Sequence, residues 1–222
     1  MSDIFEYGET EIRFLSAKDK RLADVIRRVG RISRAVDPDL FSSVVRHIVG
    51  QQISARAQET VWARLRERFG GQIVPAALAD ASREDLRAAG MSFRKAESIL
   101  DFAGKVVRGE FDIAAVAQMS DADATAALVG LRGIGVWTAE MILLFCLRRP
   151  NILSFGDLGI HRGMRMIFRH RRIGKALFEK YRRRFSPYCS TASLYFWAVS
   201  GGAVPALSDP AGKLPKTRSR DA

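Results

Sequence analysis

Two glycines one residue apart, Gly133 and Gly135, separate two segments whose apolar residues recur at helical spacing. Glycine allows the tight backbone turn that so short a connection needs. The stretch therefore predicts two helices joined by a glycine hairpin over residues 120–148. The second helix begins in this turn, and the N–H groups at a helix start bind anions. For a chain as basic as this one, the expected anion is a phosphate.

Twenty residues after Trp137, a short turn over residues 154–160 brings Asp157 to the start of another predicted helix. An aspartate in this place accepts backbone N–H groups as an N-cap. A helix N-terminus also stabilises the anionic form of a carboxylate, so a cap can serve in chemistry as well. Residues 154–160 are our candidate catalytic turn, and the alternative is that Asp157 is a helix cap alone.

The net charge is +12 and the sequence pI is about 10.4, which favours a polyanionic partner. Much of the excess follows Asp157, where a basic run interleaved with apolar residues is opposed by Glu179 alone. We interpret this run as a surface that follows a nucleic-acid backbone. Its members are Arg162, Arg165, Arg169, Arg171, Arg172, Lys175, Lys180, Arg182, Arg183 and Arg184.

Several classes of protein are not indicated. No apolar run suits a signal peptide or a membrane span, so we expect no membrane partner and a cytoplasmic, nucleoid-associated protein. Cys146 and Cys189 fall on apolar segments and are expected in the core. Two cysteines cannot supply a four-cysteine iron–sulfur cluster, and no spacing of His and Cys indicates zinc.

The periodicity is helical throughout, because no stretch alternates long enough to predict a sheet. Residues 1–36 are expected to form an arm and a first helix that pack on the body. Asp37 and Pro38 then predict an N-cap and a first helical residue, which open a core over residues 37–202. Residues 203–222 are rich in proline and basic residues and are predicted to be disordered.

The pattern Leu-x-Gly-Ile-Gly-x-Trp-Thr-Ala from Leu131, followed by Asp157, resembles the helix-hairpin-helix DNA glycosylase superfamily. Trp137 points to its 3-methyladenine DNA glycosylase II branch, and the segment VRHIVGQQISARAQETV from Val45 matches early helices of that branch. The resemblance covers residues 37–202 and implies an all-α fold in which two helical lobes flank a cleft. The chain looks like a short form, too short to hold the N-terminal α/β domain of longer members.

The resemblance implies a monofunctional DNA glycosylase of base-excision repair. Such an enzyme flips a damaged base out of duplex DNA and hydrolyses its N-glycosidic bond, here that of alkylated purines such as 3-methyladenine. Asp157 aligns with the family's catalytic aspartate. Trp137 and Trp197 match two tryptophans of the base pocket, and Tyr188 is a weaker candidate. Trp137 also stands where strand-nicking members carry a Schiff-base lysine, so no lyase activity is expected.

The matching positions also suggest contacts with DNA. Phe93 falls where the family places an apolar wedge that fills the gap left by the flipped base, although it could instead pack in the core or as a helix staple. Gln51 and Gln52 could equally form an ordinary polar turn. The DNA-binding candidates are Gln51, Gln52, Phe93, Arg94, Gly133, Gly135, Val136, Thr138 and Arg162.

No cofactor is expected to be required. The family hairpin holds a monovalent cation, Na+ or K+, through main-chain carbonyls, which the resemblance places at Val129, Leu131 and Ile134. The expected partner is duplex DNA with a damaged base, bound by a monomer. Gly159 stands where several branches carry histidine in an Asp-x-His motif, which also favours the alkylation branch.

Two alternatives remain open. The chain could be a glycosylase of the same fold for hypoxanthine or an oxidised guanine. It could also be a helix-hairpin-helix DNA-binding module without catalysis.

Overall fold

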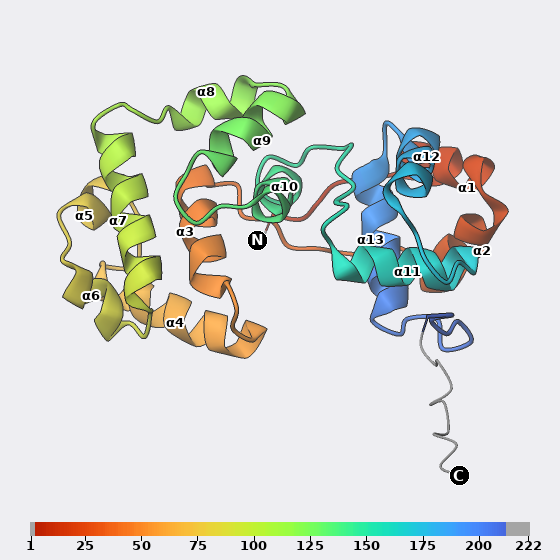
Figure 1. Cartoon of the computed structure of the whole chain (residues 1–222), viewed down its shortest axis with the longest axis horizontal. Coiled ribbons are helices and arrows are strands. Elements are labelled where there is room, and N and C mark those ends of the chain that lie inside the picture. Colours follow the sequence, from red (N-terminus) through yellow and green to blue (C-terminus); the bar gives the residue numbers. More distant parts are fainter. Residues whose placement is uncertain (1–2, 212–222) are drawn as a thin grey trace, which may run out of the picture. The chain divides into compact units, whose positions relative to one another are not determined.

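A computed structural model describes residues 3–211, and helices make up nearly all of the regular structure in that range (Figure 1). Within it, extended backbone pairs only at an isolated bridge between Ile4 and Ala35. The all-α prediction is confirmed. None of the helices in this range is long and apolar enough to span a membrane.

The chain divides into two compact units, and each combines two separate stretches of sequence. Residues 3–5 and Ala35–Arg149 form one, which we call the hairpin unit. Glu6–Arg34 and residues 150–211 form the other, which we call the aspartate unit. This division differs from the linear one expected from the sequence, because residues 6–34 belong with the C-terminal part of the chain.

The core of the hairpin unit is built around α3, which packs against α4, α7 and α10. Val44, Val45 and Val49 of α3 are fully buried, and Phe41 stacks on Phe102 of α7 with ring centroids 5.0 Å apart. The helices of this unit are α3 (Leu40–Gly50), α4 (Ala55–Arg68), α5 (Pro75–Ala79), α6 (Arg83–Ala88), α7 (Phe93–Val107), α8 (Ile113–Gln118), α9 (Asp121–Val129) and α10 (Val136–Phe145).

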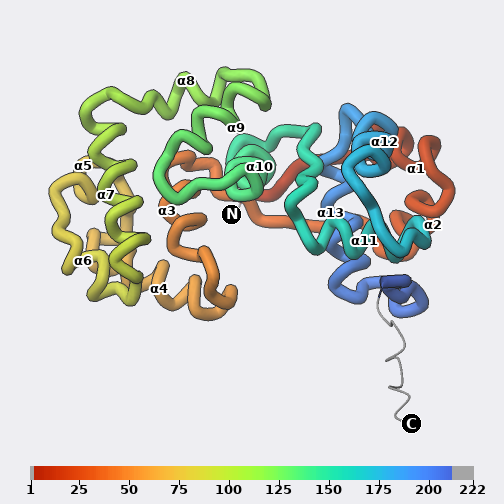
Figure 2. Tube along the Cα trace, viewed as in Figure 1, coloured from red at the N-terminus to blue at the C-terminus, as the bar shows by residue number. Residues whose placement is uncertain are grey.

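The aspartate unit is organised around α13, which is buried along most of its length and packs on α2, α11 and α12. Figure 2 traces the chain from α11 through α12 into α13. Phe168 stacks on Tyr181 with centroids 4.3 Å apart and meets Phe196 of α13 edge-on. The helices are α1 (Glu9–Lys18), α2 (Lys20–Val29), α11 (Leu158–Phe168), α12 (Lys175–Phe185) and α13 (Cys189–Ser200).

Each unit contains one of the two cysteines, and both are buried, as predicted. Cys146 is 4% exposed and Cys189 is fully buried. Burial raises the pKa of both thiols to about 12, since an apolar environment disfavours the thiolate. Both cysteines therefore act as small core residues.

The N-terminal segment is more regular than expected. Residues expected to be an arm form α1, whose N-cap is Gly8; the Gly8 N–H donates to the Glu11 carboxylate at 2.8 Å. The apolar face of α1 is narrow, and Leu15 is its fully buried residue. The spacing of apolar residues in this segment therefore did not predict a helix. The predicted first helix corresponds to α2, which ends before its C-cap Gly30.

The predicted cap of the next helix was wrong by two residues. The N-cap of α3 is Asp39, whose Oδ1 accepts the N–H groups of Phe41 and Ser42 at 3.0 and 3.2 Å. Asp37 instead accepts the Asp39 N–H at 3.3 Å and lies before the helix. The sequence Asp-Pro-Asp offers two possible caps, and the second directly precedes the apolar face of α3.

The C-terminal tail is ordered further than predicted. Val204 is 3% exposed, and Asp209 receives the Arg165 guanidinium with both oxygens, Nε lying 2.9 Å from Oδ1. This pair holds residues up to 209 against α11, because a two-point contact between guanidinium and carboxylate fixes both groups. The remainder of the predicted disordered tail, residues 212–222, lies outside the described residues.

Candidate active site

The predicted hairpin forms as two helices joined by a glycine turn. Ser120 caps α9, and after α9 the chain turns through Gly133, whose φ of 85° suits glycine, into α10 (Figure 2). Leu131 and Ile134 are 4% and 5% exposed and anchor the turn in the core. Gly135 is the N-cap of α10, and as a glycine it has no side chain to accept the first N–H groups of this helix. Its first backbone N–H groups remain our candidate anion site, because the first N–H groups of a helix have no partner within the helix.

The residues predicted around this helix start differ in exposure. Val136 is 56% exposed and Trp137 is 45% exposed, so both offer apolar surface at the first turn of α10. Thr138 is only 6% exposed. A contact with DNA from Thr138 would therefore use its backbone rather than its hydroxyl.

The glutamine turn lies directly against the hairpin. Gln51, the C-cap of α3, donates from Nε2 to the Gly133 carbonyl at 2.6 Å, and Gln52 takes a left-handed conformation with φ of 56°. Both glutamines and Gly133 line a small hollow of about 110 Å³ together with the start of α7, including Arg94 and Lys95. Four of the predicted DNA-binding residues thus meet in the hairpin unit.

Phe93 is the first residue of α7, after its N-cap Ser92. It is 49% exposed, and the Arg87 guanidinium lies 3.8 Å from the centroid of its ring. So exposed a ring is not a core residue, which disfavours one alternative considered for Phe93. Lys95, two residues on, donates to the Val49 carbonyl at 2.8 Å, and partial burial lowers its pKa.

Asp157 is the N-cap of α11, as predicted, and it is 7% exposed. Its Oδ1 accepts two hydrogen bonds, from the Ile160 N–H at 2.8 Å and from Trp197 Nε1 at 2.9 Å. The structure thus brings together Asp157 and Trp197, two predicted site residues 40 positions apart. A carboxylate held at a helix start can stabilise a positive charge that develops beside it.

Residues outside the predicted site residues hold the turn before Asp157. His161 Nε2 lies 2.8 Å from the Phe155 carbonyl, and its ring stacks on Phe178. Further back, the Ser190 hydroxyl accepts the Ile152 N–H at 2.9 Å, and Arg182 donates to the Leu153 carbonyl at 2.8 Å. No local pattern reveals these contacts, because most of the partners are backbone groups distant in sequence.

Tyr188 lies apart from Asp157. It is the N-cap residue of α13, nine residues before Trp197, so roughly 13 Å of helix separates the two at the usual rise of 1.5 Å per residue. Its ring meets that of Phe14 edge-on, with centroids 5.2 Å apart. This position gives no support to Tyr188 as a pocket residue.

The basic run after Asp157 is only partly a free surface, which corrects the expectation that Glu179 alone opposes it. Arg165 pairs with Asp209, and Arg184 Nη1 lies 2.7 Å from Asp19 Oδ2. These acidic partners are remote in sequence, so the local composition did not reveal them. The exposed members of the run are Arg162, Arg169, Arg171, Arg172, Lys175, Lys180 and Arg183.

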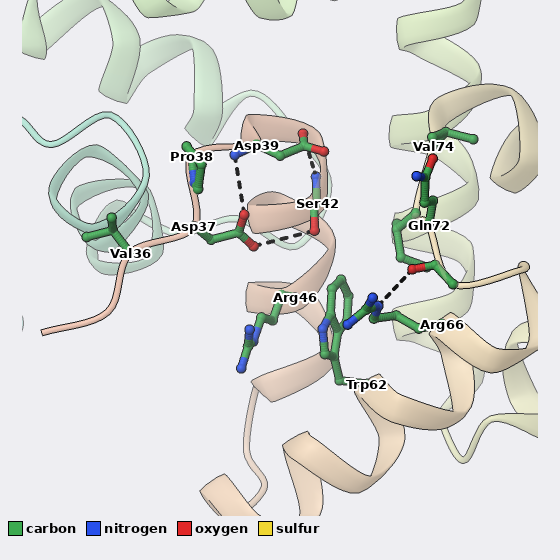
Figure 3. A pocket seen from close by; sticks show the side chains of 12 residues that line it. Val36, Asp37, Pro38, Asp39, Ser42, Arg46, Trp62, Arg66, Gln72 and Val74 are labelled. Carbon is green, nitrogen blue, oxygen red and sulfur yellow. Dashed lines mark hydrogen bonds between the residues drawn. The ribbon is translucent and has the colours of Figure 1, made fainter. Parts of the chain in front are cut away.

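A larger hollow, of about 550 Å³, lies elsewhere in the hairpin unit, beside the starts of α3 and α5 (Figure 3). Arg46 lies over the Trp62 ring at 5.6 Å and pairs with Glu59 at 2.6 Å, while Arg66 donates to the Gly71 carbonyl. The residues that line it include none of the predicted site residues. We therefore give this hollow no part in the chemistry.

The hairpin backbone is compatible with the cation that the resemblance implies. Of the three carbonyls concerned, that of Leu131 accepts the Ile134 N–H at 3.1 Å and so closes the turn. A carbonyl oxygen has a second lone pair, which leaves it able to bind a cation as well. Val129 and Ile134 would supply the other two carbonyls.

The model of the HhH-GPD superfamily of base excision DNA repair proteins matches residues 45–187, which include the glutamine turn, the hairpin and Asp157. The chain belongs to this superfamily. Trp197 lies beyond the matched range.

Two solved structures of HhH-GPD type resemble the chain closely. A DNA-3-methyladenine glycosidase from Bacillus halodurans is 32% identical with a TM-score of 0.80, covering 90% of this chain and 93% of the other. The 3-methyladenine DNA glycosylase Mag1 of Schizosaccharomyces pombe, solved in complex with abasic DNA, is 27% identical with a TM-score of 0.76, covering 86% and 97%. The chain also matches the Bacillus subtilis protein YfjP at 29% identity over 170 residues, 73% of this chain, and spans 59% of that relative's length.

Proposed function

We propose that the chain is a monofunctional DNA glycosylase of base-excision repair that hydrolyses the N-glycosidic bond of alkylated purines, such as 3-methyladenine, in duplex DNA. The observation that carries the proposal is the Asp157 carboxylate, held at the start of α11 by two hydrogen bonds in a chain of the HhH-GPD superfamily. Such an enzyme would act where the chromosome lies, as a cytoplasmic, nucleoid-associated monomer.

DNA binding would begin with the phosphate backbone. The open start of α10 at Gly133, Gly135 and Val136 would receive a phosphate on its N–H groups, and Thr138 would contribute its backbone. A monovalent cation held by the carbonyls of Val129, Leu131 and Ile134 would add positive charge to this site. The remaining backbone contacts would come from Gln51, Gln52, Arg94 and Arg162.

Base flipping would then expose the sugar, because the anomeric carbon is shielded inside the stacked duplex. Phe93 is suited to fill the gap, since its ring is half exposed at the start of α7 and basic side chains flank it. The stack with Arg87 would hold the ring outward before DNA arrives.

The chemical step would rest on Asp157. Cleavage of the N-glycosidic bond develops positive charge on the sugar, and a nearby carboxylate stabilises it and orients the attacking water. The bond between the base nitrogen and the sugar carbon breaks, and the cationic base leaves with the bonding electrons as a neutral purine. Water supplies the new hydroxyl, and its other proton passes to the Asp157 carboxylate or to solvent. An alkylated purine is cationic and leaves readily, so stacking on Trp137 and Trp197 would suffice to hold it.

The product would be an abasic site in an intact strand. Strand cleavage by this class needs an amine that forms a Schiff base with the sugar, and Trp137 stands where that lysine would be. Tyr188, at the far end of α13, is the weakest of the proposed pocket residues.

The test is base release from duplexes that carry 3-methyladenine, hypoxanthine or 8-oxoguanine, at one enzyme concentration. The proposal predicts release of 3-methyladenine, with strand breaks only after alkali. Release of another base alone would assign the same chemistry to a different lesion. No release from any duplex, with DNA binding retained, would leave a binding module without catalysis.

A further inference from the structure

Helix α11 packs against α13 (Figure 1). The face of α11 that meets α13 carries two glycines one helical turn apart, Gly159 and Gly163. A Cβ atom placed on Gly163 would lie 2.0 Å from the carbonyl oxygen of Phe196. The backbone of α13 therefore occupies the space that any side chain at position 163 would need. This close approach brings the next residue of α13, Trp197, to the start of α11.

The space beside Gly159 is filled by the Trp197 indole. A Cβ atom on Gly159 would lie 2.9 Å from Cδ1 and 3.3 Å from Nε1 of that indole, and 3.2 Å from Asp157 Oδ1. Cβ atoms essentially never lie within 3.0 Å of a non-bonded heavy atom, so a side chain at position 159 would displace the ring. The same ring edge makes the 2.9 Å hydrogen bond to Asp157.

We propose that Gly159 and Trp197 act together as positioning residues for Asp157. Gly159 provides the room in which the indole N–H reaches the carboxylate, and Trp197 then fixes the carboxylate. This inference rests on the proposed function and adds a role for Trp197 distinct from stacking on the base. It also gives a physical reason for glycine two residues after Asp157: a histidine there would occupy the place of the indole.

The hydrogen bond from Trp197 adds a constraint on the orientation of the Asp157 carboxylate that the helix cap alone does not give. The Ile160 N–H binds Oδ1 from within the first turn of α11, as in any N-cap. Trp197 binds the same oxygen from another helix. One donor leaves the carboxylate able to pivot about that contact, whereas two donors from different directions define its plane. Catalysis by a carboxylate depends on such fixed orientation, because a displacement of about 1 Å can cost about a hundredfold in rate.

Two substitutions separate positioning from packing. Trp197→Phe keeps an aromatic ring but removes the N–H donor. Gly159→Ala keeps every functional group and adds one methyl against the indole; helix propensity alone would favour alanine there. Gly174→Ala is the matched control. Gly174 is the N-cap of α12 in the same unit; its φ is negative, and nothing lies within 4 Å of the added methyl.

The experiment measures single-turnover release of 3-methyladenine and affinity for an abasic duplex. We expect Gly159→Ala and Trp197→Phe each to slow base release at least tenfold, while their affinity for the abasic duplex stays within about threefold of the parent. The control Gly174→Ala should stay within about twofold of the parent in both release rate and affinity. The double variant should be no slower than the slower single variant, because both changes remove the same hydrogen bond. Release by Gly159→Ala within twofold of the parent, or multiplicative effects in the double variant, would overturn the proposal.

A second measurement does not depend on activity. The chain has three tryptophans, so an NMR spectrum shows few indole ¹H–¹⁵N signals. The signal of Trp197 is identified as the one that is absent from the spectrum of Trp197→Phe. Gly159→Ala should shift that signal and leave the signal of Trp62, in the other unit, unchanged. An unshifted Trp197 signal would overturn the positioning role alone. A parent protein that releases no base from any lesion would instead overturn the proposed function, and the role of Asp157 with it.

Discussion

The side-chain amide of Gln51 donates to the carbonyl of Gly133 at 2.6 Å and so fastens the end of α3 to the turn of the hairpin, 82 residues away. If the hairpin binds phosphate, Gln51→Ala should weaken binding to an abasic duplex, because the turn loses its tether. A typical hydrogen bond contributes about 1 kcal/mol net, which corresponds to about fivefold in affinity. Titration of labelled duplex checks this.

Gln72→Ala is the matched control, since Gln72 is exposed and lies beside the larger hollow rather than the hairpin. It should bind DNA as the parent does. Equal affinity for Gln51→Ala and Gln72→Ala would contradict a role for the tether.

Arg162 is exposed on the first turns of α11, and we predict that it contacts a phosphate. Each phosphate contact adds about 0.9 to the slope of log affinity against log salt concentration. Arg162→Ala should therefore reduce the measured slope by about that amount. Arg27→Ala should not, because Arg27 lies on α2, outside the basic run, where it pairs with Asp24. A slope near zero for the parent would remove the nucleic-acid interpretation altogether.

Phe93 is predicted to act as the wedge. Phe93→Ala should slow base release about tenfold or more, because unstacking a base costs a few kcal/mol that the ring no longer offsets. The melting temperature should change little, since the ring is 49% exposed. Val107→Ala, at the other end of α7 and 54% exposed, is the control for losing exposed apolar surface. A sharp fall in melting temperature with an unchanged rate per folded molecule would make Phe93 a packing residue.

His47 gives a pH dependence of stability that is independent of catalysis. Burial is the largest influence on this imidazole of α3 and lowers its pKa from the ordinary 6.5, against the opposing hydrogen bond between Nδ1 and the Ser43 carbonyl. As the pH falls below 6.5, His47 binds a proton in the unfolded chain but stays neutral in the folded protein, so the free energy of unfolding decreases. Above that pH both states are neutral and the contribution is constant.

Urea unfolding of the parent and of His47→Gln between pH 5 and 7.5 measures this. The stability of the parent relative to the variant should decrease as the pH falls, because the variant lacks the titrating group. Parallel curves over that window would show that His47 titrates alike in both states.

Much of the fold could be predicted because its signals are local. Ser120 before α9, the glycines of the hairpin and Asp157 before α11 each act on backbone within a few residues, so the sequence shows their roles directly. The choice between Asp37 and Asp39 as a cap failed because both satisfy the same local rule.

The rest depends on contacts between distant residues. Trp197 matched a pocket residue of the family, but nothing in its neighbours reveals that its indole N–H reaches Asp157. The pairing of Arg184 with Asp19 likewise spans 165 positions and removes one arginine from an otherwise one-sided basic run. Only the folded chain shows which of these charges remain available to DNA.

The central claim is that Asp157 acts through its charge, and Asp157→Asn tests it most directly. Asparagine caps a helix about as well as aspartate and can still accept from Ile160 and Trp197, so folding and DNA binding should persist. Asp39→Asn makes the same change at the N-cap of α3 and should leave the rate unaltered. Single-turnover release of 3-methyladenine or hypoxanthine by folded Asp157→Asn should fall by about two orders of magnitude or more. A rate within a few-fold of the parent would contradict the account and reduce Asp157 to a helix cap.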